Sequence, residues 1–308
     1  MPRRQLHLVA ALLLVLASVS AARAEDASFL SDGVKIHYII EGAGEPVLLI
    51  HGFSANIPMQ WGLPGVIKEL AKEYQVIAID NRGHGRSGKP HDVKDYGLKM
   101  VEDSVRLLDH LKIEKAHVVG YSMGGFITGK LVATHPDRII SATLGGAGWE
   151  KPNDESMSFM KELAESLEAG KGIGPLIIRL TPEGTPKPTD EQIAGINSMI
   201  MLTNDQKALA AVIRGMPEFA VTEENLKANK IPTLALIGAL DPLKVGVDQM
   251  KPVMSNLKVV VIENADHMTA FTKPEFLGEL KPFLAANSVN KDKPAKEKPV
   301  AVGAGAKD

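Results

Sequence analysis

Short runs of apolar residues alternate with longer stretches of helical periodicity along most of the chain. Continuous apolar runs indicate strands that are covered on both faces of a sheet. These runs occupy residues 46–50, 75–79, 116–120, 139–144, 233–237 and 259–262, and a half-exposed alternating run precedes them at 34–39. Helical spacing appears at residues 66–74, 100–111 and 274–284. The alternation predicts an α/β fold with a mostly parallel central sheet and helices on both faces.

One region breaks this alternation, because residues 149–222 show helical periods only. Three helices are predicted there, at 156–169, 190–202 and 205–216, and prolines separate them. An all-helical insertion between two strands of a parallel sheet is expected to form a cap over the strand ends, where ligands bind. The insertion is rich in apolar side chains and contains no tyrosine, which predicts a modest apolar pocket beneath it.

The first residues have the pattern of a secretory signal peptide. Arg3 and Arg4 precede an apolar run over residues 6–20, and Ala22 and Ala24 form a small-x-small cleavage site. The run is shorter than the roughly 20 residues that cross a bilayer comfortably. We therefore expect cleavage near Ala24, export to the periplasm or the medium, and no stable membrane insertion afterwards. An uncleaved membrane anchor is the alternative.

The last residues differ in composition from the rest of the chain. From residue 287 onward Lys, Pro, Ala and Gly dominate without an apolar period, which is typical of a disordered tail. The sequence thus predicts five segments. They are a signal peptide (1–24), the first part of a core domain (25–148), a helical cap (149–222), the second part of the core (223–286) and a tail (287–308).

Composition narrows the possible partners. The formal net charge of the 308 residues is −2, and cleavage after Ala24 would remove three arginines and leave −5. This acidic balance, without a stripe of Lys and Arg, argues against nucleic-acid binding. The chain has no cysteine, which excludes disulfides and lipid attachment at a cysteine. The sequence makes no prediction of the oligomeric state.

A serine motif follows the predicted strand at 116–120. Residues 120–124 read Gly-Tyr-Ser-Met-Gly, the Gly-x-Ser-x-Gly pattern of a sharp turn from a strand into a helix. Gly120 and Gly124 lack a Cβ atom, so strand and helix can approach closely and lift the Ser122 hydroxyl clear of the sheet. The N–H groups at the helix start favour negative charge that develops beside the serine. Ser122 is therefore the candidate nucleophile.

A serine hydroxyl needs a base to accept its proton and a carboxylate to orient that base. Asp241 and His267 each lie in the loop after one of two successive predicted strands, downstream of Ser122. This order of nucleophile, acid and histidine is the one expected after such a turn. Glu150 is the alternative acid. Asp266 is a poor one, because neighbouring side chains diverge in an extended loop.

Two backbone N–H groups are the candidate donors to an oxyanion. One is that of Met123, at the start of the helix, and the other is that of Phe53, in the loop after the strand at 46–50. Gly52 lets this loop turn inward. His51 precedes the nucleophile in the chain, and we expect it to brace the loop by hydrogen bonds rather than to act as the base.

Together these features resemble the α/β-hydrolase family, in particular its cap-bearing esterase, lactonase and C–C hydrolase branch. The resemblance covers residues 29–284 and rests on His51, Gly52, residues 80–88 (Asp-Asn-Arg-Gly-His-Gly-Arg-Ser-Gly), residues 120–125, Asp241 and His267. It implies an α/β-hydrolase fold with a helical cap insertion. It also implies that residues 80–88 form a structural loop in which Arg82 and His84 serve the scaffold rather than catalysis.

The sequence predicts a serine hydrolase of small to medium apolar carboxylic esters, without a metal or organic cofactor. A lactonase or a C–C bond hydrolase would use the same triad, although Ser54 and its neighbours depart from the glycine-rich loop usual in C–C hydrolases. Haloalkane dehalogenases and epoxide hydrolases share the scaffold but use an aspartate where this chain has Ser122. A binding protein of receptor type that retains the triad is the alternative from another class.

Overall fold

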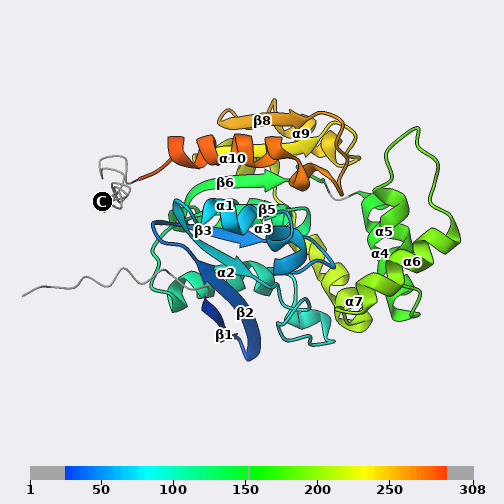
Figure 1. Ribbon diagram of the computed structural model, residues 1–308. Helices are drawn as coiled ribbons and strands as arrows, with labels where there is room; N and C mark the ends of the chain where they lie inside the picture. The colour runs from blue at the N-terminus through cyan, green and yellow to red at the C-terminus, as the bar shows by residue number, and fades with distance from the viewer. Residues whose placement is uncertain (1–24, 152, 290–308) are drawn as a thin grey trace, which may run out of the picture.

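The computed structural model describes residues 25–151 and 153–289 (Figure 1). Its centre is an eight-stranded sheet with the strand order β1-β2-β4-β3-β5-β6-β7-β8. The β1–β2 and β2–β4 pairs are antiparallel, and all other neighbouring strands are parallel. The strands are β1 (Glu25–Ser31), β2 (Val34–Glu41), β3 (Glu45–Ile50), β4 (Tyr74–Ile79), β5 (Ala116–Tyr121), β6 (Ile139–Gly145), β7 (Thr233–Gly238) and β8 (Leu257–Ile262). The prediction of a mostly parallel central sheet is confirmed.

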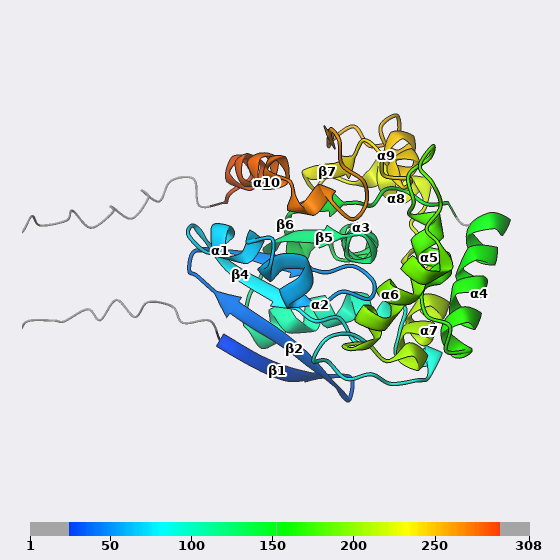
Figure 2. The same cartoon turned by 45° about the vertical axis from the view of Figure 1, so that its right-hand side comes forward.

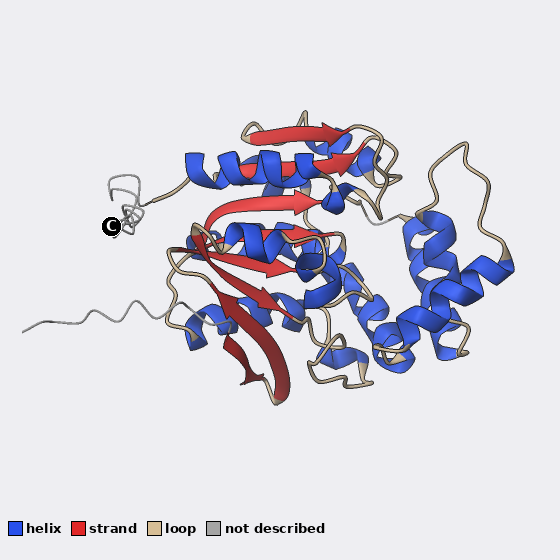
Figure 3. Cartoon of the chain, viewed as in Figure 1, coloured by secondary structure: helices blue, strands red, loops and turns tan. Residues whose placement is uncertain are grey.

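The continuous apolar runs follow from burial on both faces of the sheet. In β3, Leu48 and Ile50 point into one core, whereas Val47 and Leu49 point into the other. Helices α2 (Leu98–His110) and α3 (Met123–Thr134) cover the first face. Helices α1 (Val66–Leu70) and α10 (Pro274–Ala286) cover the second. Figure 3 shows helices in front of and behind the strands of the sheet.

The structure differs from the sequence prediction at one helix and one strand. The helix predicted over 66–74 ends at Leu70, because Tyr74 already belongs to β4, where it pairs with Glu45 of β3. The sequence pattern also gave no sign of β1, which pairs with β2 along its whole length at the edge of the sheet (Figure 2). Only part of β1 is apolar, so its extended form depends on the neighbouring strand rather than on its own pattern.

Four helices between β6 and β7 lie beyond the carboxyl ends of the parallel strands, as Figures 1 and 2 both show. They are α4 (Asp154–Glu168), α5 (Gly174–Arg179), α6 (Asp190–Met201) and α7 (Gln206–Gly215), and we call them the cap helices. They share a small core of their own that includes Leu163 and Leu209, both fully buried. Side chains at their N-termini, such as Asn153 and Thr189, accept hydrogen bonds from the first turn.

Two short helices complete the described part of the chain. Helix α8 (Glu223–Ala228) leads back to β7, and α9 (Lys244–Met250) connects β7 to β8. Within the ranges 25–151 and 153–289, no helix is both long and apolar enough to cross a lipid bilayer. The predicted signal peptide and residues 290–308 of the predicted tail lie outside the described residues.

Candidate active site

The turn that carries Ser122 connects β5 to α3. Ser122 has a φ of 54° and a ψ of −120°, a conformation that residues other than glycine rarely adopt. Its N–H donates a hydrogen bond to the Gly145 carbonyl at the end of β6 (2.8 Å). A Cβ atom on Gly124 would lie 2.0 Å from the Ile50 carbonyl oxygen, and one on Gly120 would lie 2.0 Å from the Gly124 oxygen. Both glycines are therefore required by the close approach of strand and helix.

His267 and Asp241 form a buried hydrogen-bonded pair. The His267 Nδ1 lies 2.9 Å from Asp241 Oδ2, and less than a twentieth of either side chain is exposed. The second carboxylate oxygen of Asp241 accepts the Leu243 N–H (2.9 Å), and the Tyr121 hydroxyl donates to the His267 carbonyl (2.6 Å). Because a carboxylate only accepts hydrogen bonds, the pairing places the proton on Nδ1 and leaves Nε2 as a free base.

The two alternative acids have other partners. Glu150 forms an ion pair with Arg179 of α5, at 3.0 Å between Oε1 and Nη2. Asp266 accepts hydrogen bonds from the Met268 and Thr269 N–H groups of its own turn. Neither carboxylate is paired with the His267 ring in the described residues, so the structure brings together the two partners that the order of strands predicted.

Ser122 and His267 line the same cavity. Among the described residues the Ser122 hydroxyl forms no hydrogen bond with the His267 ring. Such contacts are often long in a site without substrate and tighten when substrate binds. Ser122 and His267 thus border one cavity, and the serine–histidine hydrogen bond stays a prediction.

The predicted oxyanion donors come from two segments that meet at Ser122. Met123 is the first residue of α3, and Phe53 lies in the loop after β3. A Cβ atom on Gly52 would lie 3.2 Å from the Ser122 Cβ, so the loop runs directly against the nucleophile. Phe53 and Met123 both line the cavity with Ser122. They remain the predicted donors to the oxyanion that would form on the carbonyl of a substrate attacked by Ser122.

The cavity itself has a volume of about 380 Å³ and lies between the sheet and the cap helices. The cap helices supply mostly apolar walls, among them Phe159, Met160, Leu163, Leu176, Ile177 and Ile213. The Glu150–Arg179 pair also lines it, and the Arg179 guanidinium lies 4.5 Å from the centre of the Phe159 ring. No group of three His, Asp or Glu side chains suited to a metal ion occurs in the described ranges.

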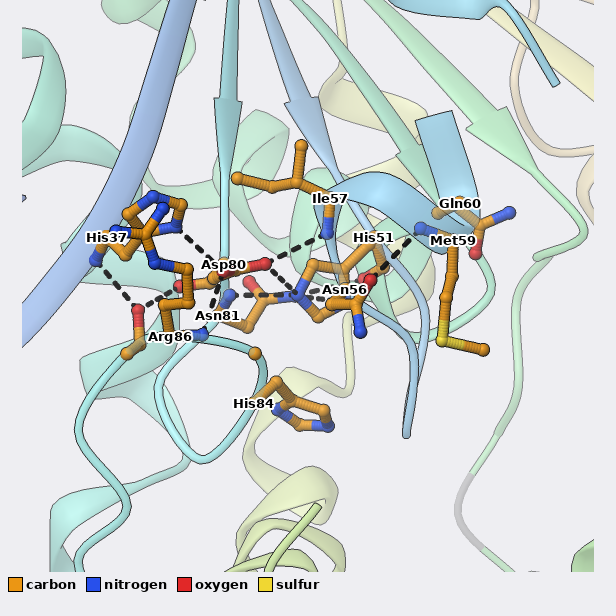
Figure 4. Close-up of polar contacts among 12 residues, drawn as sticks. His37, His51, Asn56, Ile57, Met59, Gln60, Asp80, Asn81, His84 and Arg86 are labelled. Carbon is orange, nitrogen blue, oxygen red and sulfur yellow. Dashed lines mark hydrogen bonds and ion pairs between the residues drawn. The ribbon is translucent and has the colours of Figure 1, made fainter. Parts of the chain in front are cut away.

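A buried network beside the cavity centres on Asp80, at the end of β4 (Figure 4). Its carboxylate accepts hydrogen bonds from the N–H groups of Ile57 and Arg86 (both 2.9 Å) and from the His37 ring (2.8 Å). Burial alone would raise the pKa of Asp80, but the hydrogen bond from His37, the electrostatic interaction with the His51 ring and the two backbone hydrogen bonds hold the pKa to about 2. The sequence motif at 80–88 indicated a structural loop but not this network, whose donors come from three separate segments.

The other polar residues of the motif are also buried. The Arg82 guanidinium forms two hydrogen bonds with the Asp103 carboxylate of α2, at 2.6 and 2.7 Å. His84 donates to the Arg82 carbonyl (3.0 Å), and burial lowers the pKa of His84 to about 3. Neither Arg82 nor His84 lines the cavity. Both belong to the scaffold, as the sequence implied.

Comparison with known proteins agrees with this fold. The sequence model for the alpha/beta hydrolase fold matches residues 45–170, which include β3 to the start of the cap helices. A thermophilic esterase from Thermogutta terrifontis is similar in structure, with a TM-score of 0.69 and 27% identity over 86% of this chain and 99% of that one. The chain has the α/β-hydrolase fold.

Further proteins are similar to the chain over different lengths. The enol-lactonase from Burkholderia xenovorans LB400 shares the fold, with a TM-score of 0.70 and 22% identity over 84% of this chain and 99% of that one. A 2-hydroxymuconate semialdehyde hydrolase from Pseudomonas sp. (strain CF600) is 37% identical over 131 residues, which are 42% of this chain and 46% of the relative. The chain spans 29%, 46% and 55% of the first three curated relatives it matches.

Proposed function

We propose that this α/β hydrolase is a serine esterase that cleaves small to medium apolar carboxylic esters. The observation that carries the proposal is the arrangement around one cavity of a strained serine, a histidine–aspartate pair and two backbone donors. Serine hydrolysis of acyl compounds requires these components in this relation. The apolar walls of the cavity support an ester with a hydrocarbon chain as the substrate.

In the proposed reaction, His267 Nε2 accepts the proton of Ser122 as the serine oxygen attacks the ester carbonyl. The N–H groups of Phe53 and Met123 stabilise the oxyanion. Asp241 keeps the proton on Nδ1 and stabilises the imidazolium that forms. The imidazolium then protonates the leaving alcohol, and an acyl-serine remains. Water, deprotonated by the same histidine, releases the acid and restores Ser122.

A panel of p-nitrophenyl esters of increasing acyl length, assayed with the wild type and with Ser122→Ala, tests the proposal. We expect the substitution to lower kcat by as much as about 10⁶, down to the detection limit, because the acyl-enzyme can no longer form. The fold should survive, since the serine lies at a turn and contributes little packing. Residual activity within tenfold of the wild type, with an unchanged circular dichroism spectrum, would refute the assignment.

The same panel should include lactones and a vinylogous 1,5-diketone, which is the chemical class that C–C hydrolases cleave. A lactone is an internal ester, so Ser122 could open it by the same steps. Hydrolysis of the lactones or the diketone with a higher kcat/KM than any open-chain ester would replace the esterase proposal by the corresponding alternative. Binding without turnover of any of them would favour the receptor alternative.

A further inference from the structure

The loop after β3 makes a tight turn beside the nucleophile. The Ala55 N–H donates to the Gly52 carbonyl at 3.3 Å, which closes a four-residue turn with Phe53 and Ser54 at its centre. Ser54 is buried and has a φ of 57°, a conformation that residues other than glycine rarely adopt. Gly52, Phe53 and Ser54 all line the cavity that contains Ser122. A turn of this kind keeps its conformation only when surrounding contacts hold it.

A side chain that belongs to the cap supplies such a contact. Asn204, in the connection between α6 and α7, donates from its amide nitrogen to the Ser54 carbonyl at 2.9 Å (Figure 1). The same nitrogen lies 3.0 Å from the Ile200 carbonyl near the end of α6. A carbonyl oxygen only accepts, so both contacts require the amide nitrogen, and they fix the orientation of the side chain. Within residues 25–151 and 153–289, no other hydrogen bond joins the cap helices or their connections to this turn.

Planar peptide groups connect this contact to the predicted oxyanion donor. In a trans peptide group the C=O and the N–H point in opposite directions, so a contact that fixes one also fixes the other. Asn204 holds the Ser54 carbonyl, and the N–H of the same peptide group, that of Ala55, holds the Gly52 carbonyl. The Gly52 carbonyl in turn shares its peptide group with the Phe53 N–H. A displacement of Asn204 can thus reach the Phe53 N–H through two peptide groups and one hydrogen bond.

We propose that Asn204 is a positioning residue for catalysis, which couples the position of the cap helices to the direction of the Phe53 N–H. This inference rests on the proposed serine chemistry. With the cap helices over the cavity, Asn204 holds the turn, and the oxyanion has both of its predicted donors. When the α6–α7 connection moves away, the turn loses this contact and one donor is misdirected. The enzyme is then fully active only while the cap is in place.

The expected size of the effect follows from a second contact of the Gly52 carbonyl. It also accepts a hydrogen bond from the His51 ring, with 2.7 Å to Nδ1, so His51 braces the loop from the core. This contact stays in place when Asn204 is removed, and the Phe53 N–H is loosened rather than lost. The loss of kcat should therefore be smaller than the factor of about 10² to 10³ that follows removal of a whole oxyanion donor.

Two substitutions separate this role from that of a simple clamp between cap and core. Asn204→Ala removes the contact with Ser54. His91→Ala is the matched control, because the His91 ring lies 3.0 Å from the Asp205 carboxylate and joins the core to the same α6–α7 connection without contacting the turn. With p-nitrophenyl acetate, whose short acyl group limits direct effects of the cap walls, Asn204→Ala should lower kcat about tenfold with KM within a factor of three. His91→Ala should keep kcat within about twofold of the wild type.

Binding of butylboronic acid and the melting temperature complete the test. The boronic acid forms a tetrahedral adduct with a nucleophilic serine and resembles the transition state. Its affinity should fall about tenfold in Asn204→Ala, in parallel with kcat, and be retained in His91→Ala. Equal kcat losses in the two variants, losses that follow the fall in melting temperature, or an unchanged affinity in Asn204→Ala would show that Asn204 only supports the fold and would overturn the proposal.

Amide hydrogen exchange of the turn tests the geometry independently of any activity. Exchange of the Ala55 N–H, followed by NMR, should be at least about tenfold faster in Asn204→Ala than in the wild type and unchanged in His91→Ala. Equal exchange rates in the wild type and Asn204→Ala would overturn the proposal. Failure of the underlying esterase proposal has a different signature, because the wild type itself would then bind no boronic acid and hydrolyse no ester.

Discussion

Single residues differ in how far their roles follow from the sequence. Asp241 and His267 could be predicted as partners because each follows a strand, and parallel strands end at the same edge of the sheet. The central position of Asp80 in its hydrogen-bond network could not be predicted, since the donors to its carboxylate come from β2 and from two separate loops. A buried network of this kind depends on tertiary contacts, whereas the position of a residue after a strand is visible in the pattern.

Asp241 and Glu150, the two candidate acids, should differ strongly in their contribution to catalysis. Asp241→Asn should lower kcat by about 10⁴, because an amide at this position favours the wrong tautomer of His267. Glu150→Gln is the matched control and should stay within tenfold of the wild type, since Glu150 pairs with Arg179. Steady-state kinetics of both variants on one p-nitrophenyl ester show which carboxylate is the catalytic acid. If the two effects were reversed, Glu150 would be the catalytic acid.

The Asp80 network predicts a dependence of stability on pH. The pKa of Asp80 is held to about 2 in the folded protein and lies near its ordinary value of 3.8 in the unfolded chain. The network therefore stabilises the fold fully above pH 4, by about 2 kcal/mol, and this contribution is lost as the pH falls toward 2. Urea denaturation gives the free energy of unfolding of the wild type and of Asp80→Asn. The difference between the two should be smaller at pH 3 than at pH 6, by about 1 kcal/mol. A difference independent of pH would contradict this explanation.

Elements whose pattern reflects burial on both faces were predicted well, and those that depend on a neighbour were not. The buried strands from β3 to β7 appear within a few residues of the apolar runs, because each run is covered from two sides. The edge strand β1 has little apolar pattern of its own. The short helix α5 was also missed, since its six residues are too few to show a helical period.

The turn between β5 and α3 predicts opposite effects for two glycines of one helix. A Cβ atom on Gly124 would lie 2.0 Å from the Ile50 carbonyl, so Gly124→Ala should destabilise the protein by about 3 kcal/mol or more. Nothing lies within 4 Å of a Cβ atom on Gly129, so Gly129→Ala should stabilise α3 by about 0.5–1 kcal/mol. Chemical denaturation measures both changes in the free energy of unfolding. A tolerated Gly124→Ala would mean that β3 and α3 are further apart than described.

The cap helices predict chain-length selectivity. Each accommodated methylene should add about 0.8 kcal/mol of binding, so kcat/KM should increase over the first few acyl carbons and then fall as the chain meets the cap. Ile177 lines the cavity, and Ile177→Trp should lower kcat/KM for the best ester about tenfold relative to the acetate ester. The adjacent Ile178 is exposed and does not line the cavity, so Ile178→Trp is the control.

Two outcomes would contradict this view of the cap. One is a kcat/KM that increases steadily to long-chain triglycerides. The other is a preference for anionic substrates over neutral ones of the same length. Equal effects of the two tryptophan substitutions would indicate that α5 does not border the bound acyl chain.

At the scale of the whole molecule, the α/β-hydrolase fold could be predicted because strand and helix patterns alternate on both sides of the all-helical region. The pattern also located an all-helical region, but not how its helices enclose a cavity above Ser122, which depends on packing between residues far apart in the chain. Export by an N-terminal signal peptide stays a prediction, because residues 1–24 lie outside the described part of the structure.

The central claim is that this protein acts as a hydrolase through Ser122. Reaction with a fluorophosphonate, followed by intact mass measurement and peptide mapping, tests it most directly, because the reagent forms a stable bond only with an activated serine. We predict one phosphonyl group per chain, located on Ser122, and no labelling of Ser122→Ala. Labelling should be slowed strongly in Asp241→Asn. An unlabelled wild type, or a label on another serine that persists in Ser122→Ala, would contradict the account.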